Sequence, residues 1–363
     1  MDIIDFLKTP IAALPKDRPN SIDFPDFFDS ICQGFVSGIH AINGTDQFSD
    51  AVRQNVAVIQ ELSTGITSVI KDYYAGRPQD AFKRLNDLLA THVKYFEGLY
   101  SIPIDPTYLA HLYRLRVQDT GSFTREQMFH IPFQFRHKVK TQRYSIPGFP
   151  SLYLGSSSYI GWKELGCPQF DNLYSVRLQA RTRIQVLDFG YLSGVLAEFI
   201  AVQIKSGTNN QHLLDVLLPK VLFWPLIAAC SIRTLHRDDP FKPEYIVPQM
   251  VLQYVKEVRT HKIDGIRYFS THYDQQSHSL SLGCNFVFPV KTSPTNGICS
   301  ELRQLFDMTE VLPWQIGTHV QLPSRPTGLN QEIELVKGCP CLYLNTIFGE
   351  IESKQNFMIA TPI

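Results

Sequence analysis

Residues 142–164 read QRYSIPGFPSLYLGSSSYIGWKE, which places a turn, a strand and a helix in close succession. Pro147 fixes one backbone dihedral and Gly148 permits conformations that are closed to other residues, so a turn is expected at this point. The apolar run Leu152 to Gly155 is typical of a short strand. Ser157 to Leu165 is expected to form a helix that folds back on that strand.

Three polar residues, Arg114, Arg143 and Glu164, are candidates for holding a ligand in this region. The turn would hold Arg143 rigidly beside the strand that carries Tyr153. A Glu on the buried side of the following helix would need a partner, because an unpaired buried carboxylate is costly. A ribose diol or an oxocarbenium-like sugar centre would be a suitable partner for it. The simpler alternatives are an ordinary turn with an exposed Arg and a surface Glu at helical spacing.

A locally basic segment surrounds these candidates in a chain with no formal net charge. Between His111 and Ser145 there are seven Lys or Arg residues and two acidic ones. A planar guanidinium pairs with two phosphate oxygens at once, which Lys does not do. The segment therefore suits a phosphate-bearing ligand, and a solvated basic loop is the alternative.

The first 105 residues have the pattern of helices. Apolar residues recur at spacings of three and four between Phe48 and Tyr73, which predicts one amphipathic helix. Gly76-Arg77-Pro78 interrupts the pattern, and a second helix is expected to begin at Pro78, a favoured first-turn residue. A proline-bearing connector, 101–106, ends this part. A helical N-terminal domain, residues 1–105, is expected either to pack only or to regulate.

From residue 106 to residue 290 short strand-like and helical stretches alternate irregularly, which favours a mixed α+β domain. Neither GxGxxG nor GxxxxGK[ST] occurs, so the Rossmann and P-loop phosphate cradles are excluded. Residues 291–363 contain the strand-like runs Glu332–Val336 and Cys341–Phe348 and are expected to form a β-rich extension packed on the preceding domain. The predicted strands are 152–155, 174–178, 184–189, 265–270 and 285–288, and the predicted helices are 157–165, 192–204, 213–231 and 247–260.

Composition excludes several classes of protein. Balanced charge argues against a nucleic-acid partner. The longest apolar run, Val221 to Cys230, is half of the roughly 20 residues that a membrane span needs, and no signal peptide is recognised, so a cytoplasmic protein without a membrane partner is expected. The seven cysteines are scattered without a CxxC pair, and no HExxH occurs, so no metal site is expected. His130 and His137 are expected to be structural.

In order and spacing these pieces resemble the RES-domain family, named for an Arg, a Glu and a Ser. The matching features are Tyr113-Arg114, the turn 142–148, Leu152-Tyr153 and Glu164. The Ser comes on a later strand, where Ser270 is assigned, and an Asn-x-x-x-Pro element follows from Asn285. The resemblance covers about half of the chain, residues 112–290. Gln142 stands for a Gly of the family pattern, and Ser145 stands for an Asn.

The resemblance implies an ADP-ribosyltransferase-like fold and an enzyme that degrades NAD⁺ without any bound cofactor. It implies cleavage of the nicotinamide–ribose bond by phosphorolysis, with inorganic phosphate as co-substrate, or by hydrolysis. Arg114, Glu164 and Ser270 would be the catalytic residues. Arg143 would hold the pyrophosphate or the attacking phosphate, and Tyr153 would stack on nicotinamide or the ribose. Further substrate-binding residues would be Tyr113, Tyr144 and Asn285.

The family also implies a biological setting. Many members are toxins of bacterial toxin–antitoxin pairs, so a growth-arresting toxin or anti-phage effector is expected. Because such an activity would poison its host, restraint is expected from an antitoxin or another regulatory protein, from homo-oligomerisation or from the N-terminal helices. The alternatives are an ADP-ribosyltransferase that modifies a protein and a non-catalytic sensor of NAD⁺ or ADP-ribose.

Overall fold

A computed structural model describes residues 1–100, 104, 111–206, 210–257, 263–271, 282–327, 331–336 and 338–363. These residues form two units, and the chain passes between them more than once. The first unit contains residues 1–100, 142–144 and 191–254, and the second contains 101–141, 145–190 and 255–363. The predicted connector, 101–106, lies almost wholly outside the described residues.

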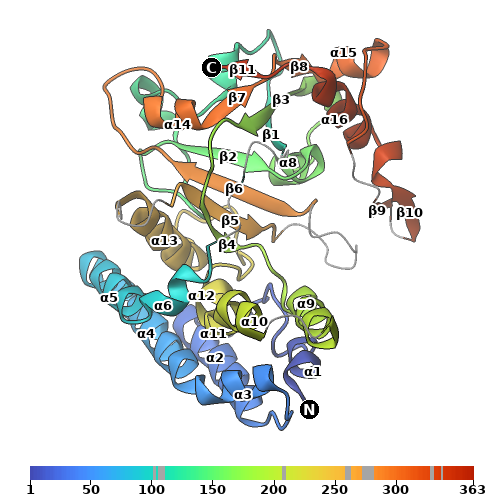
Figure 1. The fold of residues 1–363 in the computed structure, drawn as a ribbon. Coiled ribbons are helices and arrows are strands. Elements are labelled where there is room, and N and C mark those ends of the chain that lie inside the picture. The colour runs from blue at the N-terminus through green and yellow to red at the C-terminus, as the bar shows by residue number, and fades with distance from the viewer. Residues whose placement is uncertain are drawn as a thin grey trace. The chain divides into compact units, whose positions relative to one another are not determined.

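The first unit is helical (Figure 1). It differs from the predicted N-terminal domain because residues 191–254, which were expected in the catalytic domain, pack with residues 1–100. Its helices are α1 (Ile3–Leu7), α2 (Phe24–His40), α3 (Gln47–Gln54), α4 (Val56–Tyr74), α5 (Pro78–Thr91), α6 (Val93–Glu97), α9 (Ser193–Ser206), α10 (Asn210–Val216), α11 (Leu218–Leu222) and α12 (Trp224–Ala229), with most of α13 (Ile246–Glu257).

Contacts between distant parts of the sequence hold the helical unit together. The rings of Phe35 in α2 and Trp224 in α12 stack with centroids 4.0 Å apart. The indole N–H of Trp224 donates to the carbonyl of Ala12 at 2.9 Å, and the Ser193 hydroxyl donates to the same carbonyl at 2.6 Å. The segment after α1 is thereby tied to α9 and α12, which explains why residues 191–254 belong to this unit.

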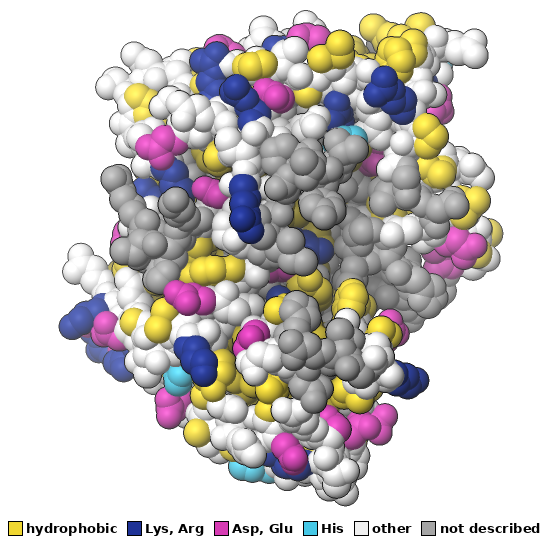
Figure 2. All heavy atoms as spheres, in the orientation of Figure 1, with side chains coloured by type: hydrophobic (Ala, Val, Ile, Leu, Met, Phe, Trp, Pro, Cys, Tyr) yellow, Lys and Arg dark blue, Asp and Glu magenta, His cyan; other side chains and the backbone are white. Residues whose placement is uncertain are grey.

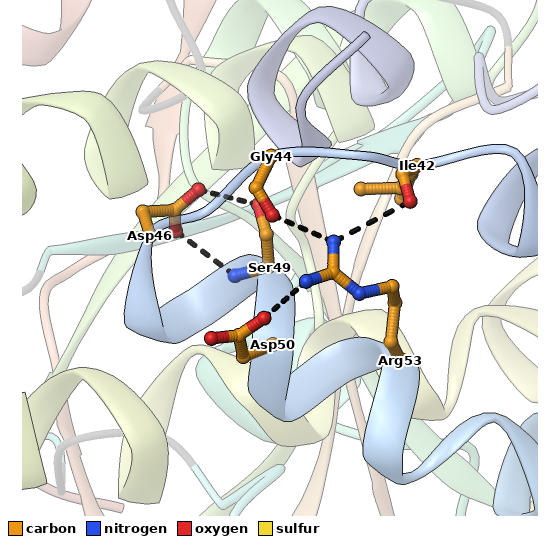
Figure 3. Close-up of polar contacts among 6 residues, drawn as sticks. All are labelled: Ile42, Gly44, Asp46, Ser49, Asp50 and Arg53. Atoms are coloured by element: carbon orange, nitrogen blue, oxygen red, sulfur yellow. Dashed lines mark hydrogen bonds and ion pairs between the residues drawn. The ribbon is translucent and has the colours of Figure 1, made fainter.

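The predicted helix from Phe48 to Tyr73 is two helices, α3 and α4, separated at Asn55. A polar network fixes the start of α3 (Figure 3). The Asp46 carboxylate caps the helix by accepting from the backbone N–H of Ser49 at 2.9 Å and from its hydroxyl at 2.5 Å. Arg53 pairs with Asp50 and donates to the Gly44 carbonyl at 2.6 Å. Capping and this pairing thus set the boundaries of α3, which hydrophobic periodicity alone did not reveal.

The predicted helix start at Pro78 is confirmed, since α5 begins there. Asp72, near the end of α4, holds Arg77 at 2.5 Å and Arg84 at 2.7 Å. The same contacts lower the pKa of Asp72. These ion pairs link the end of α4 to α5 across the turn.

The second unit is built on a mixed nine-stranded sheet with the order β11-β7-β3-β1-β2-β6-β5-β4, and β8 pairs with β3 (Figure 1). Only β4 and β5 run parallel; the other described pairs are antiparallel. The strands are β1 (Leu112–Val117), β2 (Ser151–Gly155), β3 (Leu173–Ala180), β4 (Val186–Phe189), β5 (Gly265–Phe269), β6 (Cys284–Pro289), β7 (Phe306–Met308), β8 (Leu312–Pro313) and β11 (Thr361–Pro362).

The two faces of the sheet carry separate cores, because successive side chains of a strand point to opposite sides. Leu112, Leu154 and Phe286 pack on one face with α7 (Arg125–Met128) and α14 (Ser300–Leu305). Tyr113 and Leu115 pack on the other face with α8 (Ser158–Glu164), α15 (Trp314–His319) and α16 (Ile347–Phe357). The α+β class and the predicted strands of the central sheet are confirmed.

The C-terminal residues complete this sheet and do not form a separate β-rich extension. They supply β7, β8 and β11 together with three helices, α14, α15 and α16. The strand predicted over Cys341–Phe348 is wrong: the hairpin of β9 (Glu332–Val336) and β10 (Cys339–Leu342) ends there, and α16 begins at Ile347. The Thr346 side chain caps α16 by accepting from the Gly349 N–H, a local signal that strand-like composition concealed.

His130 is a satisfied core histidine, as predicted. Its Nε2 accepts from the Cys299 N–H at 2.7 Å, and its Nδ1 lies 2.8 Å from the Ile131 carbonyl, which requires the proton on Nδ1. Burial lowers the pKa of His130 to about 4. The unfolded chain therefore binds more protons than the folded chain below about pH 6.5.

We expect His130 to make stability depend on pH. Its stabilising contribution is complete above the unfolded pKa of about 6.5 and is lost as the pH falls toward 4. The free energy of unfolding of the wild type minus that of His130→Asn should fall by about 2 to 3 kcal/mol between pH 7 and pH 4.5. Urea titrations of both proteins at the two pH values measure it. A difference that stays constant with pH would show that His130 titrates normally.

Candidate functional site

Glu164, Ser270 and Asn285 meet at one carboxylate oxygen. The Ser270 hydroxyl donates to Glu164 Oε1 at 2.5 Å, and the Asn285 side-chain N–H donates to the same oxygen at 2.7 Å. Ser270 and Asn285 are 3% and 5% exposed, whereas Glu164 is an exposed residue. Two buried neutral donors thus fix the carboxylate of an exposed residue.

The register of β5 and β6 explains how the two donors converge. Tyr268 in β5 pairs with Asn285 in β6, so their side chains share a face of the sheet. Ser270 follows Tyr268 by two residues and directly succeeds β5, so alternation puts it on that face as well. The sequence resemblance named both Ser270 and Asn285, and the structure brings them to Glu164.

Local contacts place Glu164 as the last residue of α8. The Ser157 hydroxyl caps the helix by accepting from the Ile160 N–H at 3.2 Å and itself donates to the Leu282 carbonyl at 2.7 Å. After the helix, Gly166 and Cys167 have positive φ values of 82° and 58°. Left-handed residues at this position end a helix abruptly, so α8 ends at Glu164.

Gly155, between β2 and α8, has no room for a side chain. A Cβ there would lie 2.6 Å from Ile160 Cγ2 and 2.8 Å from the Ser157 carbonyl oxygen. We expect Gly155→Ala to lower the free energy of unfolding by about 1 to 3 kcal/mol because α8 must shift away from β2. Thermal or urea unfolding measures this.

Gly194→Ala is the matched control, because a Cβ at Gly194 in α9 meets nothing within 4 Å. That substitution should leave stability unchanged or raise it by up to about 1 kcal/mol. Equal stability of the two variants would contradict the close packing of α8 on β2.

Arg114 lies where β1 and β2 separate. The described β1–β2 pairing consists of one registered pair, Tyr113 with Gly155. Beyond it, Arg114 Nη1 donates to the Tyr153 backbone carbonyl at 2.9 Å. The Arg114 side chain thus bonds to the backbone of β2 beyond the single registered β1–β2 pair.

The guanidinium of Arg114 has few hydrogen-bond partners among the described residues. Its Nε is buried and, among the described residues, has no hydrogen-bond acceptor. No described carboxylate forms an ion pair with it either. Burial, followed by the nearby Arg116, lowers the pKa of Arg114 to about 9, so the side chain is still cationic at neutral pH. A buried cation without an acid is a natural anion-binding group.

Arg114 lies two strands away from Asn285 in the sheet, and no described interaction joins it to the Glu164 cluster. Tyr113, Gly155 and Asn285 form one row across β1, β2 and β6, so two strand spacings, about 10 Å, separate the backbones of β1 and β6. Tyr153 lies in β2 between them and is half-buried. Arg114 alternates with Tyr113 in β1, so its side chain points to the opposite face of the sheet from Asn285, and no described contact brings it to the Glu164 cluster.

Three predicted substrate-binding residues have structural contacts of their own. Tyr113 is 3% exposed and packs in the core beneath α8 and α16, so its expected contact with substrate does not fit its burial. Arg143 and Tyr144 belong to the helical unit. Arg143 lies over the Tyr245 ring at 5.4 Å and donates to the Cys230 carbonyl at 3.3 Å, and Tyr144 is fully buried.

One neighbour of the cluster escaped the sequence analysis. Tyr268 is half-buried and lies on the same face as Asn285 and Ser270, directly opposite Asn285 in the sheet. Its position two residues before Ser270 was the available signal, because strand residues two apart share a face. With Tyr153 it gives the site two aromatic rings that can contact a flat ligand.

Other kinds of site find little support in the described residues. They include no group of three or more His, Cys, Asp or Glu side chains that could hold a metal ion. No helix in the described ranges has the length and apolarity to cross a membrane. Acidic and basic side chains of the described residues are mixed over the face drawn in Figure 2. A hollow of about 560 Å³ beside α4 and α5 is lined by three basic and three acidic side chains, Arg77, Lys83, Arg84, Asp72, Asp80 and Asp87, so it has no charge preference.

The chain is similar in sequence to a known bacterial protein. No family model matches the chain, and no solved structure matches it. The chain is 28% identical over 355 residues to the Bacillus subtilis (strain 168) protein named "Putative toxin YopC". The match covers 94% of this chain and 77% of that protein. The similarity therefore extends through both units, and the chain is related over nearly its whole length to a protein named as a toxin.

Proposed function

We propose that the protein degrades NAD⁺ by cleaving the bond between nicotinamide and ribose, and that it acts as a toxin. The observation that carries the proposal is that Glu164 is an exposed residue whose carboxylate is fixed at one oxygen by Ser270 at 2.5 Å and Asn285 at 2.7 Å. A fixed negative charge beside the sugar stabilises the positive charge that develops there as the bond to nicotinamide breaks.

Arg114 supplies the complementary part of the site. NAD⁺ carries a pyrophosphate beyond the ribose that is cleaved, and Arg114 is a cation without a described carboxylate partner. Arg114 is half-buried, and a guanidinium donates charge-assisted hydrogen bonds to phosphate oxygens that are about twice as strong as neutral ones. Arg114 lies where the β1–β2 ladder ends, and alternation points it to the opposite face from Asn285, so a ligand with its ribose at Glu164 and a phosphate at Arg114 would pass between these two strands.

Each group of the site has a role in the proposed reaction. The C1′–N bond breaks, and its electron pair leaves with nicotinamide, which departs as a neutral molecule and needs no strong general acid. The ribose acquires oxocarbenium character, and the Glu164 carboxylate stabilises that charge. An oxygen of phosphate or water then bonds to C1′, and in hydrolysis the water proton passes to solvent. Ser270 and Asn285 hold Glu164, and Tyr153 or Tyr268 contacts the nicotinamide ring or the ribose face.

The toxin role is supported by the name of the relative, whose similarity spans 94% of this chain. Depletion of NAD⁺ would arrest growth, which connects the proposed chemistry to that name. The protein must then be restrained in its host. An antitoxin or another protein partner is the form of restraint that we propose.

The experiment incubates the full chain with NAD⁺ labelled in the adenosine part, in buffers with and without inorganic phosphate. Release of nicotinamide in excess over enzyme is expected. A requirement for phosphate would identify phosphorolysis, and equal rates in both buffers would identify hydrolysis. Label that stays on a protein would instead identify ADP-ribosyl transfer. Intact NAD⁺ after prolonged incubation would contradict the proposal.

A further inference from the structure

Glu352, in the C-terminal helix α16, is hydrogen-bonded directly to the helix that carries Glu164. It is fully buried, and its Oε1 accepts from the Ser158 backbone N–H at 2.6 Å and from the Ser158 hydroxyl at 2.8 Å. The Tyr343 hydroxyl donates to the same oxygen at 2.5 Å. Because Ser158 is the first residue of α8, Glu352 fixes the end of α8 opposite to Glu164.

The same helix also contacts β1, the strand that carries Arg114. The Tyr113 hydroxyl donates to the side chain of Asn356 in α16 at 3.3 Å. Phe348, at the start of α16, packs edge-on against Tyr159 of α8, with ring centroids 5.1 Å apart. One C-terminal helix therefore touches both elements on which the proposed site is built.

Strand pairing in the sheet does not by itself fix the orientation of α8 relative to β1. β1 and β2 share one registered pair, and α8 follows β2. Gly161 of α8 lies close to Leu115 of β1, and a Cβ at Gly161 would be 3.1 Å from the Leu115 Cδ1. Such an apolar contact sets a separation but not an orientation, because hydrophobic packing is non-directional. Hydrogen bonds are directional, and Glu352 accepts three of them.

We infer that Glu352 is a positioning residue that, from α16, fixes the orientation of α8 and thereby of the Glu164 carboxylate. This inference rests on the proposed function of Glu164 and gives the C-terminal residues a part in the site. The burial of Glu352 has a cost, since its Oε2 is buried without a hydrogen-bond partner among the described residues. Burial also raises the pKa of Glu352 to about 7, so a neutral amide resembles its protonated form.

Three variants test the inference by the rate of nicotinamide release. Glu352→Ala removes the acceptor, and kcat should fall about 100-fold while KM changes less than about threefold, because a displaced carboxylate affects the transition state most. Glu352→Gln retains an acceptor oxygen and should keep kcat within about fivefold of the wild type. Glu350→Gln is the matched control, because Glu350 lies on the same helix, is exposed and pairs with Lys354. A folded Glu352→Ala protein with wild-type kcat would overturn the inference.

If Glu352→Ala fails to fold, milder substitutions can test whether Glu352 positions α8. Ser158→Ala and Tyr343→Phe each remove one hydroxyl donor to Glu352. Each should lower kcat about tenfold in a folded protein, and unchanged kcat in both would overturn the inference.

Hydrogen exchange separates this inference from the proposed function. Backbone amides of α8 should exchange at least about tenfold faster in these variants, with α5 unchanged. If the wild type released no nicotinamide, the proposed function would fail, and the exchange of α8 would still show whether Glu352 orients it. Unchanged exchange in α8 would overturn the positioning role.

Discussion

Glu164→Gln is expected to lower the rate of nicotinamide release by about 10² to 10³-fold, because it removes the charge that would stabilise the oxocarbenium-like ribose. The amide oxygen of Gln can still accept from Ser270 and Asn285, so the side chain should remain in place. The melting temperature should therefore change by no more than a few degrees. Nicotinamide release at saturating NAD⁺ and thermal unfolding measure the two effects.

Glu301→Gln is the control for Glu164→Gln, since Glu301 is an exposed residue of α14. It should leave activity unchanged. In a bacterial host, induction of the wild type and of Glu301→Gln should arrest growth, whereas Glu164→Gln should not. Undiminished activity of Glu164→Gln would remove this residue from the reaction.

Arg114→Met is expected to lower activity without lowering stability. Loss of the cation should lower kcat/KM by about 10² to 10³-fold, because a charged hydrogen bond to phosphate is lost. The melting temperature should stay the same or rise, since burial lowers the pKa of Arg114 and its buried Nε lacks a described partner. Replacing a poorly paired buried charge by an apolar side chain of similar volume is often neutral or stabilising.

Arg116→Met is the matched control, two residues further along β1. Arg116 donates to the Gln127 carbonyl and lies over the Phe123 ring at 5.1 Å, so its partners are structural. Its substitution should change kcat/KM less than about threefold and should lower stability modestly. If Arg114→Met were strongly destabilised instead, Arg114 would be a structural residue and its assignment to phosphate would lose its basis.

The sequence was most informative where local signals agreed. The β2–α8 unit followed from the turn at 147–148, the apolar run at 152–155 and the helical pattern after it. The convergence of Ser270 and Asn285 on Glu164 could not follow from periodicity, because Glu164 and Asn285 are 121 residues apart. Their order within the family resemblance supplied it. Tyr268 was not predicted, although it precedes Ser270 by two residues and so shares its face of the sheet.

The features that the sequence did not predict depend on long-range contacts. The helical unit is discontinuous because α9 and α12 hold the segment after α1 through Ala12, a backbone contact that no side-chain pattern reveals. Deletion of residues 1–101 would therefore remove part of a unit and would not test restraint by a separable domain. Glu352 was likewise invisible, because its partner Ser158 lies 194 residues away and serves as an ordinary helix start.

The most direct measurement is quantitative chromatography of nicotinamide after NAD⁺ is mixed with equal amounts of wild-type and Glu164→Gln protein. The proposed site predicts many molecules of nicotinamide per wild-type chain and a rate for Glu164→Gln lower by about 10² to 10³-fold. No release above the enzyme-free blank by the folded wild type, or equal release by both proteins, would contradict it.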